Sequence, residues 1–367
     1  MKAIWNLLIG LPHIRKALYG IIREETMYYS EEIEKDTKYR QEYVEGIDAF
    51  LNLSKKKADK IRGEYITPEK YKNNPEKFRK ALVEQLGYPL TTTKEMPLLK
   101  EKKFVSKDGN VNIYRMQFEF FGFLKFYGLY LEQTENSQEK PFVLGLHGGD
   151  GTPELVSSIY SDSANYNHLV RRITDKGASV FVPQLLLWKQ DIYGNNYNRH
   201  DTDGKFRQLG GSITAFEVYL MQCCIDYFIK YEKINVDRIG VAGLSYGGMY
   251  AAHLAAVDTR IKVCYSCSWA NDVFVVSWED WSYKCAQKRF TTAETLALIA
   301  PRALVVAMGD KDELFDSKLM VKECEKVKPY YSIFGKDDDF KYITFNGTHE
   351  SDKSDEEIDF LFDNLCK

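Results

Sequence analysis

Two kinds of hydrophobic pattern divide this 367-residue chain near residue 100. Before that point, apolar residues recur at helical spacing among many lysines and glutamates, which predicts helices over 31–53 and 75–86. The second helix has a typical start at Asn74-Pro75-Glu76 and a typical stop at Gly87-Tyr88-Pro89. We therefore expect residues 1–100 to form a helical extension that packs on the main domain or on a neighbouring subunit.

After residue 100, alternating apolar and polar positions predict antiparallel strands, and short apolar runs then alternate with helical segments. The expected strands are 104–105, 111–120, 126–131, 142–146, 178–182, 239–242, 261–265, 303–308 and 341–345. The helices expected among them are 165–176, 211–231, 246–257, 317–327 and 355–365. Strands that alternate with helices form a mostly parallel, doubly wound sheet. We therefore predict an α/β domain over residues 101–367, with a lid-like insertion at 267–295.

One stretch carries a recognisable chemical motif. Residues 243–247 read Gly-Leu-Ser-Tyr-Gly, the G-x-S-x-G pattern of a nucleophile elbow, between a strand-like and a helix-like run. Such an elbow leaves Ser245 at the apex of a sharp turn and places the amide of Tyr246 at a helix N-terminus, where it can donate to an oxyanion. The alternative is a glycine-rich turn with a surface serine.

A serine nucleophile needs a base. In the fold in which nucleophile elbows occur, the base comes after the serine along the chain. Of the six histidines, only His253 and His349 come after Ser245. His253 lies about two turns along the elbow helix, away from the serine. His349 follows a strand in a polar loop, which predicts that it is the base; the alternative is a surface loop histidine.

The acid that orients the base is expected after the 303–308 strand, where several carboxylates compete. Asp310 directly follows a turn glycine and is expected to bond the turn. Asp316 resembles the N-cap of the next helix. Asp312 lies between them in the loop, so we favour Asp312 as the partner of His349.

Two further parts of a site are expected from loops. The second oxyanion amide should come from the turn after the 142–146 strand, with Gly149 favoured and Gly148 or Asp150 as alternatives. Aromatic side chains of the insertion and of the loop after the 178–182 strand either line an acyl or sugar pocket or form a small satellite core. These side chains include Trp188, Trp269, Trp278 and Trp281. We expect structural roles for His147, in the turn after the 142–146 strand, and for Glu217, inside a long helix.

Composition narrows the class of protein. A formal net charge of −3 without a basic cluster gives no electrostatic support for nucleic-acid binding. The seven scattered cysteines show no zinc-ligand spacing, which favours reduced thiols. The apolar N-terminal stretch is too short to span a bilayer and has no cleavage site. We expect a cytoplasmic protein that needs no metal or cofactor.

Four motifs in the required order, HGGDGTPE (147–154), GLSYGG (243–248), PRALVVAMGDKDELF (301–315) and GTHE (347–350), resemble those of the α/β-hydrolase superfamily. More narrowly, the chain resembles the dienelactone hydrolase and acetyl xylan esterase group over roughly residues 100–367. The resemblance implies a Ser245–Asp312–His349 triad with oxyanion amides from Tyr246 and the Gly148–Gly149 turn. Asp150 departs from the pattern, since many relatives have glycine there.

The expected function is that of a serine carboxylic-ester hydrolase acting on small acylated compounds or carbohydrate esters. A serine at the elbow, where dienelactone hydrolases have cysteine, favours ordinary ester hydrolysis. Two alternatives are a serine oligopeptidase or amidase and a non-catalytic binding protein built on a hydrolase scaffold. The sequence leaves open the acyl group, the alcohol and whether the protein is a homo-oligomer.

Overall fold

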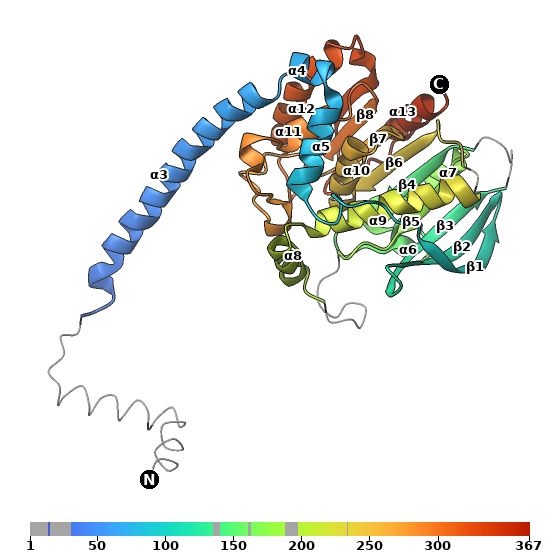
Figure 1. Ribbon diagram of the computed structural model, residues 1–367, viewed down its shortest axis with the longest axis horizontal. Coiled ribbons are helices and arrows are strands. Elements are labelled where there is room, and N and C mark those ends of the chain that lie inside the picture. Colours follow the sequence, from blue (N-terminus) through green and yellow to red (C-terminus); the bar gives the residue numbers. More distant parts are fainter. Residues whose placement is uncertain (1–13, 15–30, 135–139, 161–162, 188–196, 233) are drawn as a thin grey trace. The chain divides into compact units, whose positions relative to one another are not determined.

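The computed structural model of the chain describes residues 14, 31–134, 140–160, 163–187, 197–232 and 234–367. It divides into two compact units, Met1–Lys57 and Ala58–Lys367. The first contains most of α3 (Glu34–Tyr65), and the second contains a large α/β body (Figure 1). The expected domain boundary near residue 100 falls inside the second unit, because α4 (Pro68–Asn73) and α5 (Pro75–Leu86) bury Tyr71 and Phe78 there.

The second unit is organised around a nine-stranded sheet formed by the described residues, in the order β1-β2-β3-β5-β4-β6-β7-β8-β9. The first four in this order pair antiparallel, and β5, β4, β6, β7, β8 and β9 run parallel (Figure 1). The strands are β1 (Leu98–Asp108), β2 (Val111–Phe120), β3 (Leu124–Gln133), β4 (Phe142–Leu146), β5 (Ser179–Pro183), β6 (Ile239–Leu244), β7 (Ile261–Cys267), β8 (Ala303–Gly309) and β9 (Phe340–Phe345). The predicted mostly parallel, doubly wound sheet is therefore confirmed.

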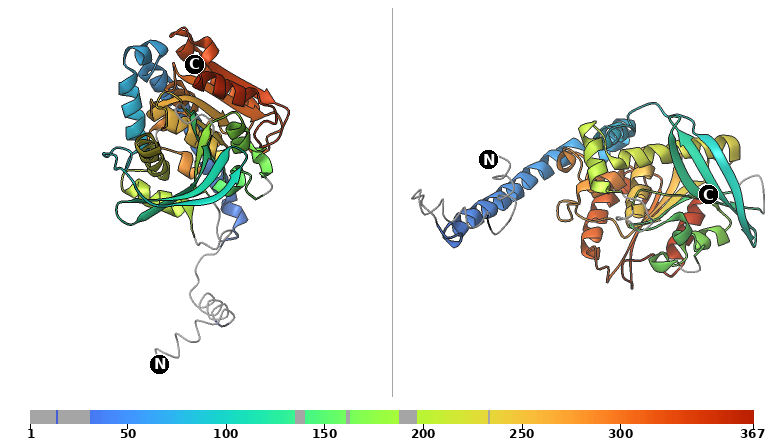
Figure 2. Two further views of the ribbon diagram at one scale, coloured as in Figure 1. Left: turned by 90° about the vertical axis from the view of Figure 1, so that its right-hand side faces the viewer. Right: turned by 90° about the horizontal axis from the view of Figure 1, so that it is seen from below.

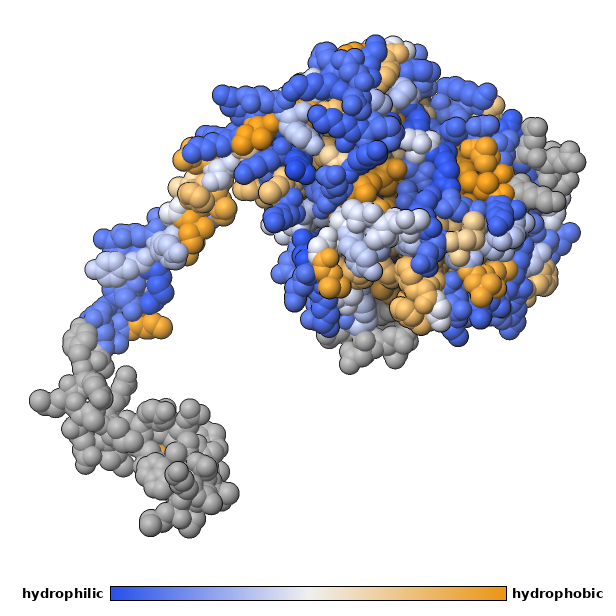
Figure 3. Space-filling model, viewed as in Figure 1, coloured by the Kyte–Doolittle hydropathy of each residue, from blue (hydrophilic) through white to orange (hydrophobic). Residues whose placement is uncertain are grey.

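Helices cover both faces of the sheet (Figure 2). Successive residues of β4 point to opposite faces, so Phe142 and Leu144 join one buried cluster and Val143 joins the other. The first cluster includes residues of α4, α5, α9 (Ile213–Tyr227), α10 (Tyr246–Val257), α11 (Thr292–Ala297) and α12 (Ser317–Ser332). The second includes residues of α6 (Pro153–Val156), α7 (Leu169–Asp175) and α13 (Glu356–Leu365). The outer surface seen in Figure 3 is mostly hydrophilic, with separate apolar patches.

Several boundaries differ from the sequence-based expectation for local reasons. The expected helix 165–176 is split into the 3₁₀ turn η1 (Ala164–Tyr166) and α7, because Asn167 and His168 adopt left-handed backbone angles (φ 47° and 57°). The expected helix 211–231 ends earlier as α9 and continues in the π-helical turn η2 (Phe228–Glu232). The sequence pattern does not predict helix α8 (Arg199–Gln208), because almost all of its residues are polar and no apolar face marks it.

The parallel strands end together, and this edge positions the candidate site. Leu244 of β6 pairs with Cys267 of β7, Cys267 pairs with Ala307 of β8, and Gly309 of β8 pairs with Phe345 of β9. The loops that follow β6, β8 and β9 therefore leave the sheet at the same edge. In open α/β sheets, this carboxyl edge is where ligands bind.

Candidate active site

Ser245 lies at the sharp turn between β6 and α10. Its backbone angles are φ 59° and ψ −121°, a combination that is strained for a residue with a side chain. Its amide donates a hydrogen bond to the carbonyl of Cys267 at 2.8 Å, which fixes the apex of the turn. The geometry is that of the expected nucleophile elbow.

The flanking glycines are required by close backbone contacts. A Cβ atom on Gly243 would lie 2.4 Å from the carbonyl carbon of Gly247. A Cβ atom on Gly247 would lie 2.1 Å from the carbonyl oxygen of Leu146, at the end of β4. Because real Cβ atoms do not approach backbone so closely, only glycine permits this strand, turn and helix to pack together.

The predicted acid and base meet at the same edge. The imidazole Nδ1 of His349 lies 2.9 Å from Oδ2 of Asp312, whose side chain is fully buried. The other oxygen of Asp312 accepts hydrogen bonds from the amides of Leu314 and Phe315. Burial alone would raise the pKa of Asp312, but the bonds from His349 and these amides outweigh it and hold the pKa below its usual value. An ionised Asp312 fixes His349 with a proton on Nδ1 and leaves Nε2 to act as a base.

The competing carboxylates have the structural roles expected of them. Asp310 accepts a hydrogen bond from the amide of Gly347, and Asp316 caps α12 by accepting one from the amide of Lys318. Glu313 accepts a hydrogen bond from the backbone amide of His349 at 3.1 Å and so helps to hold the loop. The interpretation of Asp310 and Asp316 is thus confirmed.

Cys267 links the elbow to the histidine loop. Its carbonyl accepts the amide hydrogen of Ser245, and its thiol lies 3.4 Å from the carbonyl of Glu350, the residue after His349. Aromatic rings pack beside the histidine: the ring centre of Phe315 lies 5.6 Å from that of His349, and the ring centre of Trp281 lies 5.7 Å from that of Phe315. Among the described residues no hydrogen bond joins the Ser245 hydroxyl to the imidazole, and such bonds are often loose before substrate binds.

The turn after β4 offers one amide rather than three. The amide of Gly148 donates to the hydroxyl of Tyr166 at 2.8 Å, and the amide of Asp150 donates to the carbonyl of Leu187 at 3.0 Å. Gly149 is exposed, and a Cβ atom there would touch only the ring of Tyr246, at 3.6 Å. Of the three candidates, Gly149 is therefore the residue whose amide is best placed to donate a hydrogen bond to a ligand oxygen.

Two other histidines belong to the core. His147 is fully buried, with Nδ1 2.9 Å from the carbonyl of Gly148 and Nε2 accepting the amide hydrogen of Leu185. His253 is buried in α10 and bonds the carbonyl of Met249. Burial lowers the pKa of each to about 4, so both are neutral at physiological pH. Their buried positions support the structural role expected for His147 and the separation of His253 from the serine.

Next to the elbow lies a buried charged cluster, which we call the Arg199 cluster, formed by Arg199, Glu217, Asp280, Tyr246 and Tyr250. The Arg199 guanidinium lies 2.6 Å from Asp280 and 3.3 Å from Glu217, and donates to the Tyr250 hydroxyl at 2.8 Å. Tyr246 donates its hydroxyl hydrogen to Asp280 at 3.2 Å, and its ring lies 5.2 Å below the guanidinium. The cluster therefore connects the residue after Ser245 to the insertion and to α8.

The cluster explains how a cation is kept next to the site. Burial alone would lower the pKa of Arg199, but Tyr250, Glu217 and Asp280 more than compensate and raise it. Burial, aided by the charge of Asp280, raises the pKa of Tyr246 well above its usual value, so its hydroxyl stays protonated. Sequence reasoning assigned Glu217 a structural role but missed Arg199 and Asp280. The only signal was Glu217, a carboxylate set among apolar residues in the first half of helix α9.

The tryptophans of the insertion differ in exposure. Trp269 and Trp281 are only 2% and 3% exposed and belong to the same large buried cluster as α10 and α11. Trp278 is partly exposed, lies 4.5 Å from the ring of Trp281 and 5.7 Å from that of Tyr246. Trp278 is therefore the described tryptophan that can touch a substrate. Trp188 lies outside the described residues.

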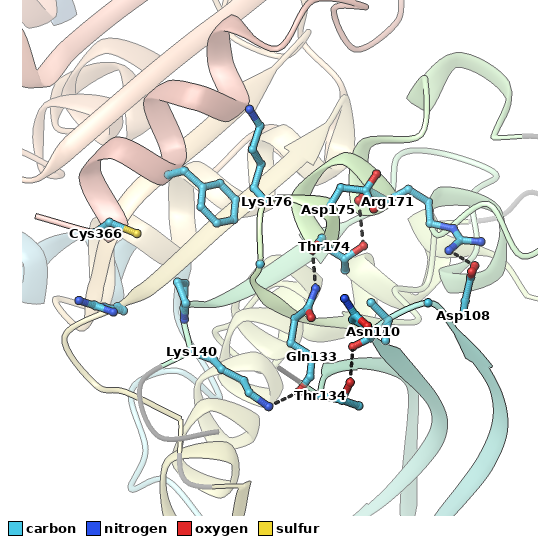
Figure 4. A pocket seen from close by; sticks show the side chains of 16 residues that line it. Asp108, Asn110, Gln133, Thr134, Lys140, Arg171, Thr174, Asp175, Lys176 and Cys366 are labelled. Atoms are coloured by element: carbon cyan, nitrogen blue, oxygen red, sulfur yellow. Dashed lines mark hydrogen bonds and ion pairs between the residues drawn. The ribbon is translucent and has the colours of Figure 1, made fainter. Parts of the chain in front are cut away.

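A cavity in the described part of the chain lies far from this edge. It measures about 1210 Å³ and is lined by residues such as Lys140, Pro141, Gly177 and Arg238, which precede β4, β5 and β6 (Figure 4). It thus opens at the amino edge of the parallel strands, opposite the elbow. Its polar groups are tied to one another, as in the ion pair of Arg171 with Asp108, so we do not regard it as the active site.

The described residues contain no group of three or more His, Cys, Asp or Glu side chains arranged to hold a metal ion. Within the same residues, no helix is both long and apolar enough to cross a bilayer. All seven cysteines are free thiols, five of them buried.

The fold and the elbow define the class: the second unit has the α/β-hydrolase fold. No family model matches the chain. Among curated proteins, the chain is 27% identical over 140 residues to the provisionally named hydrolase YtaP of Bacillus subtilis (strain 168). That match covers 36% of this chain and 47% of YtaP, so the chain spans about half the length of this relative.

Solved structures share the fold at low sequence identity. A protein from Bacteroides fragilis, provisionally described as an acetyl xylan esterase, superposes with a TM-score of 0.62 at 15% identity, covering 85% of this chain and 88% of its own. A glucuronoyl esterase from Solibacter usitatus superposes with a TM-score of 0.61 at 16% identity, covering 81% and 93%. These likenesses establish the fold of the chain.

Proposed function

We propose that this protein is a serine carboxylic-ester hydrolase that works through an acyl-enzyme. The observation that carries the proposal is the strained Ser245 at the end of β6, on the same sheet edge as a His349 held by a buried, ionised Asp312. A serine hydroxyl becomes a useful nucleophile only beside an oriented base, and this edge provides one.

In the first step, the Ser245 oxygen attacks the ester carbonyl carbon while Nε2 of His349 takes the hydroxyl proton. The resulting imidazolium is stabilised by Asp312, 2.9 Å away from Nδ1. Collapse of the tetrahedral intermediate breaks the bond to the alcohol oxygen, which receives the proton from His349. A water molecule, deprotonated by His349, then attacks the acyl-enzyme and releases the acid and Ser245.

Two backbone amides would hold the negative oxygen of the tetrahedral intermediate. The amide of Tyr246 lies at the N-terminus of α10, where the helix dipole favours negative charge. The amide of Gly149 is the second, because those of Gly148 and Asp150 already have acceptors. A single donor of this kind contributes about 10²–10³ to kcat in serine hydrolases.

We propose small acylated compounds, in particular carbohydrate esters, as substrates. Trp278 presents a partly exposed ring beside Tyr246, which suits stacking against the apolar face of a sugar. The names of the structural neighbours, an acetyl xylan esterase and a glucuronoyl esterase, favour the same class of substrate. The five buried thiols suit the cytoplasmic location expected from the sequence, which cell fractionation would test.

The test compares neighbouring carboxylates. Asp312→Asn should lower kcat for p-nitrophenyl acetate by about 10⁴, because an amide cannot hold His349 in the correct tautomer. Asp310→Asn is the matched control, since Asp310 is exposed and an amide oxygen can still accept from Gly347. Ser245→Ala should lower kcat by about 10⁴–10⁶ and abolish labelling by a fluorophosphonate. Full turnover by the Ser245→Ala protein would refute the proposal.

The same experiment separates the alternatives. A non-catalytic scaffold would give no serine adduct with the fluorophosphonate and no turnover in the wild-type protein. An oligopeptidase or amidase would label at Ser245 but would cleave matched amides as fast as esters. A panel of acetyl, feruloyl and methyl esters of carbohydrates, followed by mass, would then identify the acyl group and the alcohol.

A further inference from the structure

A small cavity is enclosed by residues of α5, α10 and the insertion, and we call it the tryptophan cavity. Its volume is about 20 Å³, and its lining includes Gln85, Met249, His253, Trp269 and Trp281. None of the three proposed triad residues lines it. A cavity needs roughly 10–15 Å³ of this volume to hold one water molecule. The tryptophan cavity therefore has room for one water molecule and is too small for a substrate.

Two buried donors of the lining lack a hydrogen-bond partner among the residues that the structure describes. Trp269 and Trp281 are more than nine-tenths buried, and the indole Nε1 of each has no acceptor there. An indole nitrogen can only donate a hydrogen bond. A buried donor without an acceptor has lost its bond to water and gained nothing in return, which destabilises the fold.

Two other lining residues supply acceptors. Gln85 donates from Nε2 to the carbonyl of Phe290 at 3.0 Å, and its Oε1 is buried without a partner among the described residues. The Nδ1 of His253 lies 2.9 Å from the carbonyl of Met249 and must carry the proton, because a carbonyl can only accept. Burial lowers the pKa of His253 to about 4, so the ring is neutral and its Nε2 has a free lone pair.

The combination of groups identifies the ligand that fits. None of the lining residues carries a charge, so an ion buried there would have no counter-charge. A cation could not accept hydrogen bonds from the indoles of Trp269 and Trp281. A simple anion could not donate to Gln85 or to His253. A water molecule can accept two hydrogen bonds and donate two, and it also has the right size.

We propose that the tryptophan cavity is a binding site for one ordered water molecule. The water accepts hydrogen bonds from Nε1 of Trp269 and Nε1 of Trp281, and it donates to Oε1 of Gln85 and Nε2 of His253. Buried waters in proteins make two to four hydrogen bonds to groups that otherwise have no partner, and this site offers four. The site does not depend on the proposed esterase activity.

The water would join three parts of the second unit that are far apart in the chain. Gln85 belongs to α5, which precedes the first strand of the sheet, and His253 belongs to the helix that follows Ser245. The ring of Trp281 packs against that of Phe315, which packs against His349. Helix α5 thus supplies an acceptor for an indole that lies two ring contacts from the proposed base.

A crystal structure of the full-length protein, at a resolution that shows ordered waters, tests the site directly. We expect density for one water oxygen within about 3.2 Å of both indole nitrogens and of Oε1 of Gln85. A cavity without such density would overturn the proposal. So would a structure in which Trp269 and Trp281 each donate to a protein acceptor instead.

Nuclear magnetic resonance tests the site in solution, on full-length protein labelled with ¹⁵N in its tryptophans. The indole hydrogens of Trp269 and Trp281 should show cross-peaks to water with opposite signs in NOE and ROE spectra, because the water tumbles with the protein. Trp278 is the control, since it is partly exposed and does not line the cavity. It should show no bound-water signal, and the absence of that signal at both Trp269 and Trp281 would contradict the proposal.

Substitutions on α5 test the acceptor. Gln85→Met keeps the length of the side chain and removes its oxygen, so the water cross-peaks of Trp269 and Trp281 should weaken together. Glu84→Met places the same side chain at the exposed neighbouring position and should leave both cross-peaks unchanged. Undiminished cross-peaks in the Gln85→Met protein would overturn the hydrogen bonding assigned here. If that variant does not fold, the wild-type crystal structure decides alone.

Discussion

Replacing Arg199 by leucine tests whether the buried charged cluster beside the elbow holds the second unit together. The side chain of Arg199 is 8% exposed and forms ion pairs with Asp280 at 2.6 Å and Glu217 at 3.3 Å. The side chains of these two carboxylates are themselves 0% and 1% exposed. The Arg199→Leu variant therefore keeps two buried negative charges and removes their cation.

Breaking a buried ion pair from one side destabilises a protein by about 3–5 kcal/mol, because the remaining charge is uncompensated. That is a large part of the total stability of roughly 5–15 kcal/mol typical of a domain. We expect the free energy of unfolding, measured by urea denaturation, to fall by that amount. Lys205→Leu is the control, since Lys205 pairs with Asp201 at 2.7 Å with both side chains mostly exposed, and it should change stability by less than about 1 kcal/mol.

A second substitution separates lost charge from lost packing. Without Arg199, Glu217 still accepts the amide hydrogen of Leu186 at 2.6 Å and the hydroxyl hydrogen of Tyr250, whereas Asp280 keeps, among the residues that the structure describes, only the bond from Tyr246. Asp280→Asn in the Arg199→Leu background should therefore recover more stability than Glu217→Gln does.

Two results would refute this reasoning. One is an Arg199→Leu protein that is as stable as the Lys205→Leu control. The other is a double variant with Asp280→Asn that is no more stable than Arg199→Leu alone, because the loss would then come from packing and not from charge.

Two other predictions concern pH and substrate. Burial raises the pKa of Glu357, which is 1% exposed, from its ordinary 4.5 to about 7, so the folded protein favours the protonated form. The stability that protonated Glu357 contributes to the folded state is fully present below pH 4.5 and is lost as the pH rises through 7. Glu357→Gln should therefore raise the urea midpoint of unfolding at pH 8 but not at pH 4.5. Equal shifts of the midpoint at both pH values would contradict this prediction. Trp278→Ala should raise KM for carbohydrate esters while leaving p-nitrophenyl acetate turnover nearly unchanged, and equal losses on both substrates would show that its ring supports the fold.

The features that depend on a few neighbouring residues were readable from the sequence. The elbow is one, because a strand, a strained Ser245 and a helix need glycines at fixed positions, and the structure gives the collisions that exclude other residues at Gly243 and Gly247. The order of the strands along the chain and the polar loop of His349 were readable for the same reason. A hydrophobic period reports which side of an element is buried, so the α/β class follows from it.

The contacts between residues that are far apart in the chain were decided only by the tertiary structure. The choice of Gly149 over Gly148 depends on a hydroxyl from Tyr166, and the Arg199 cluster joins residues from α8, α9, α10 and the insertion. Trp269 and Trp281 are tryptophans of the same insertion as Trp278, but they are buried. Such contacts lie between residues far apart in the chain, where spacing carries no signal, because the partner of a buried polar group is set by how the elements pack.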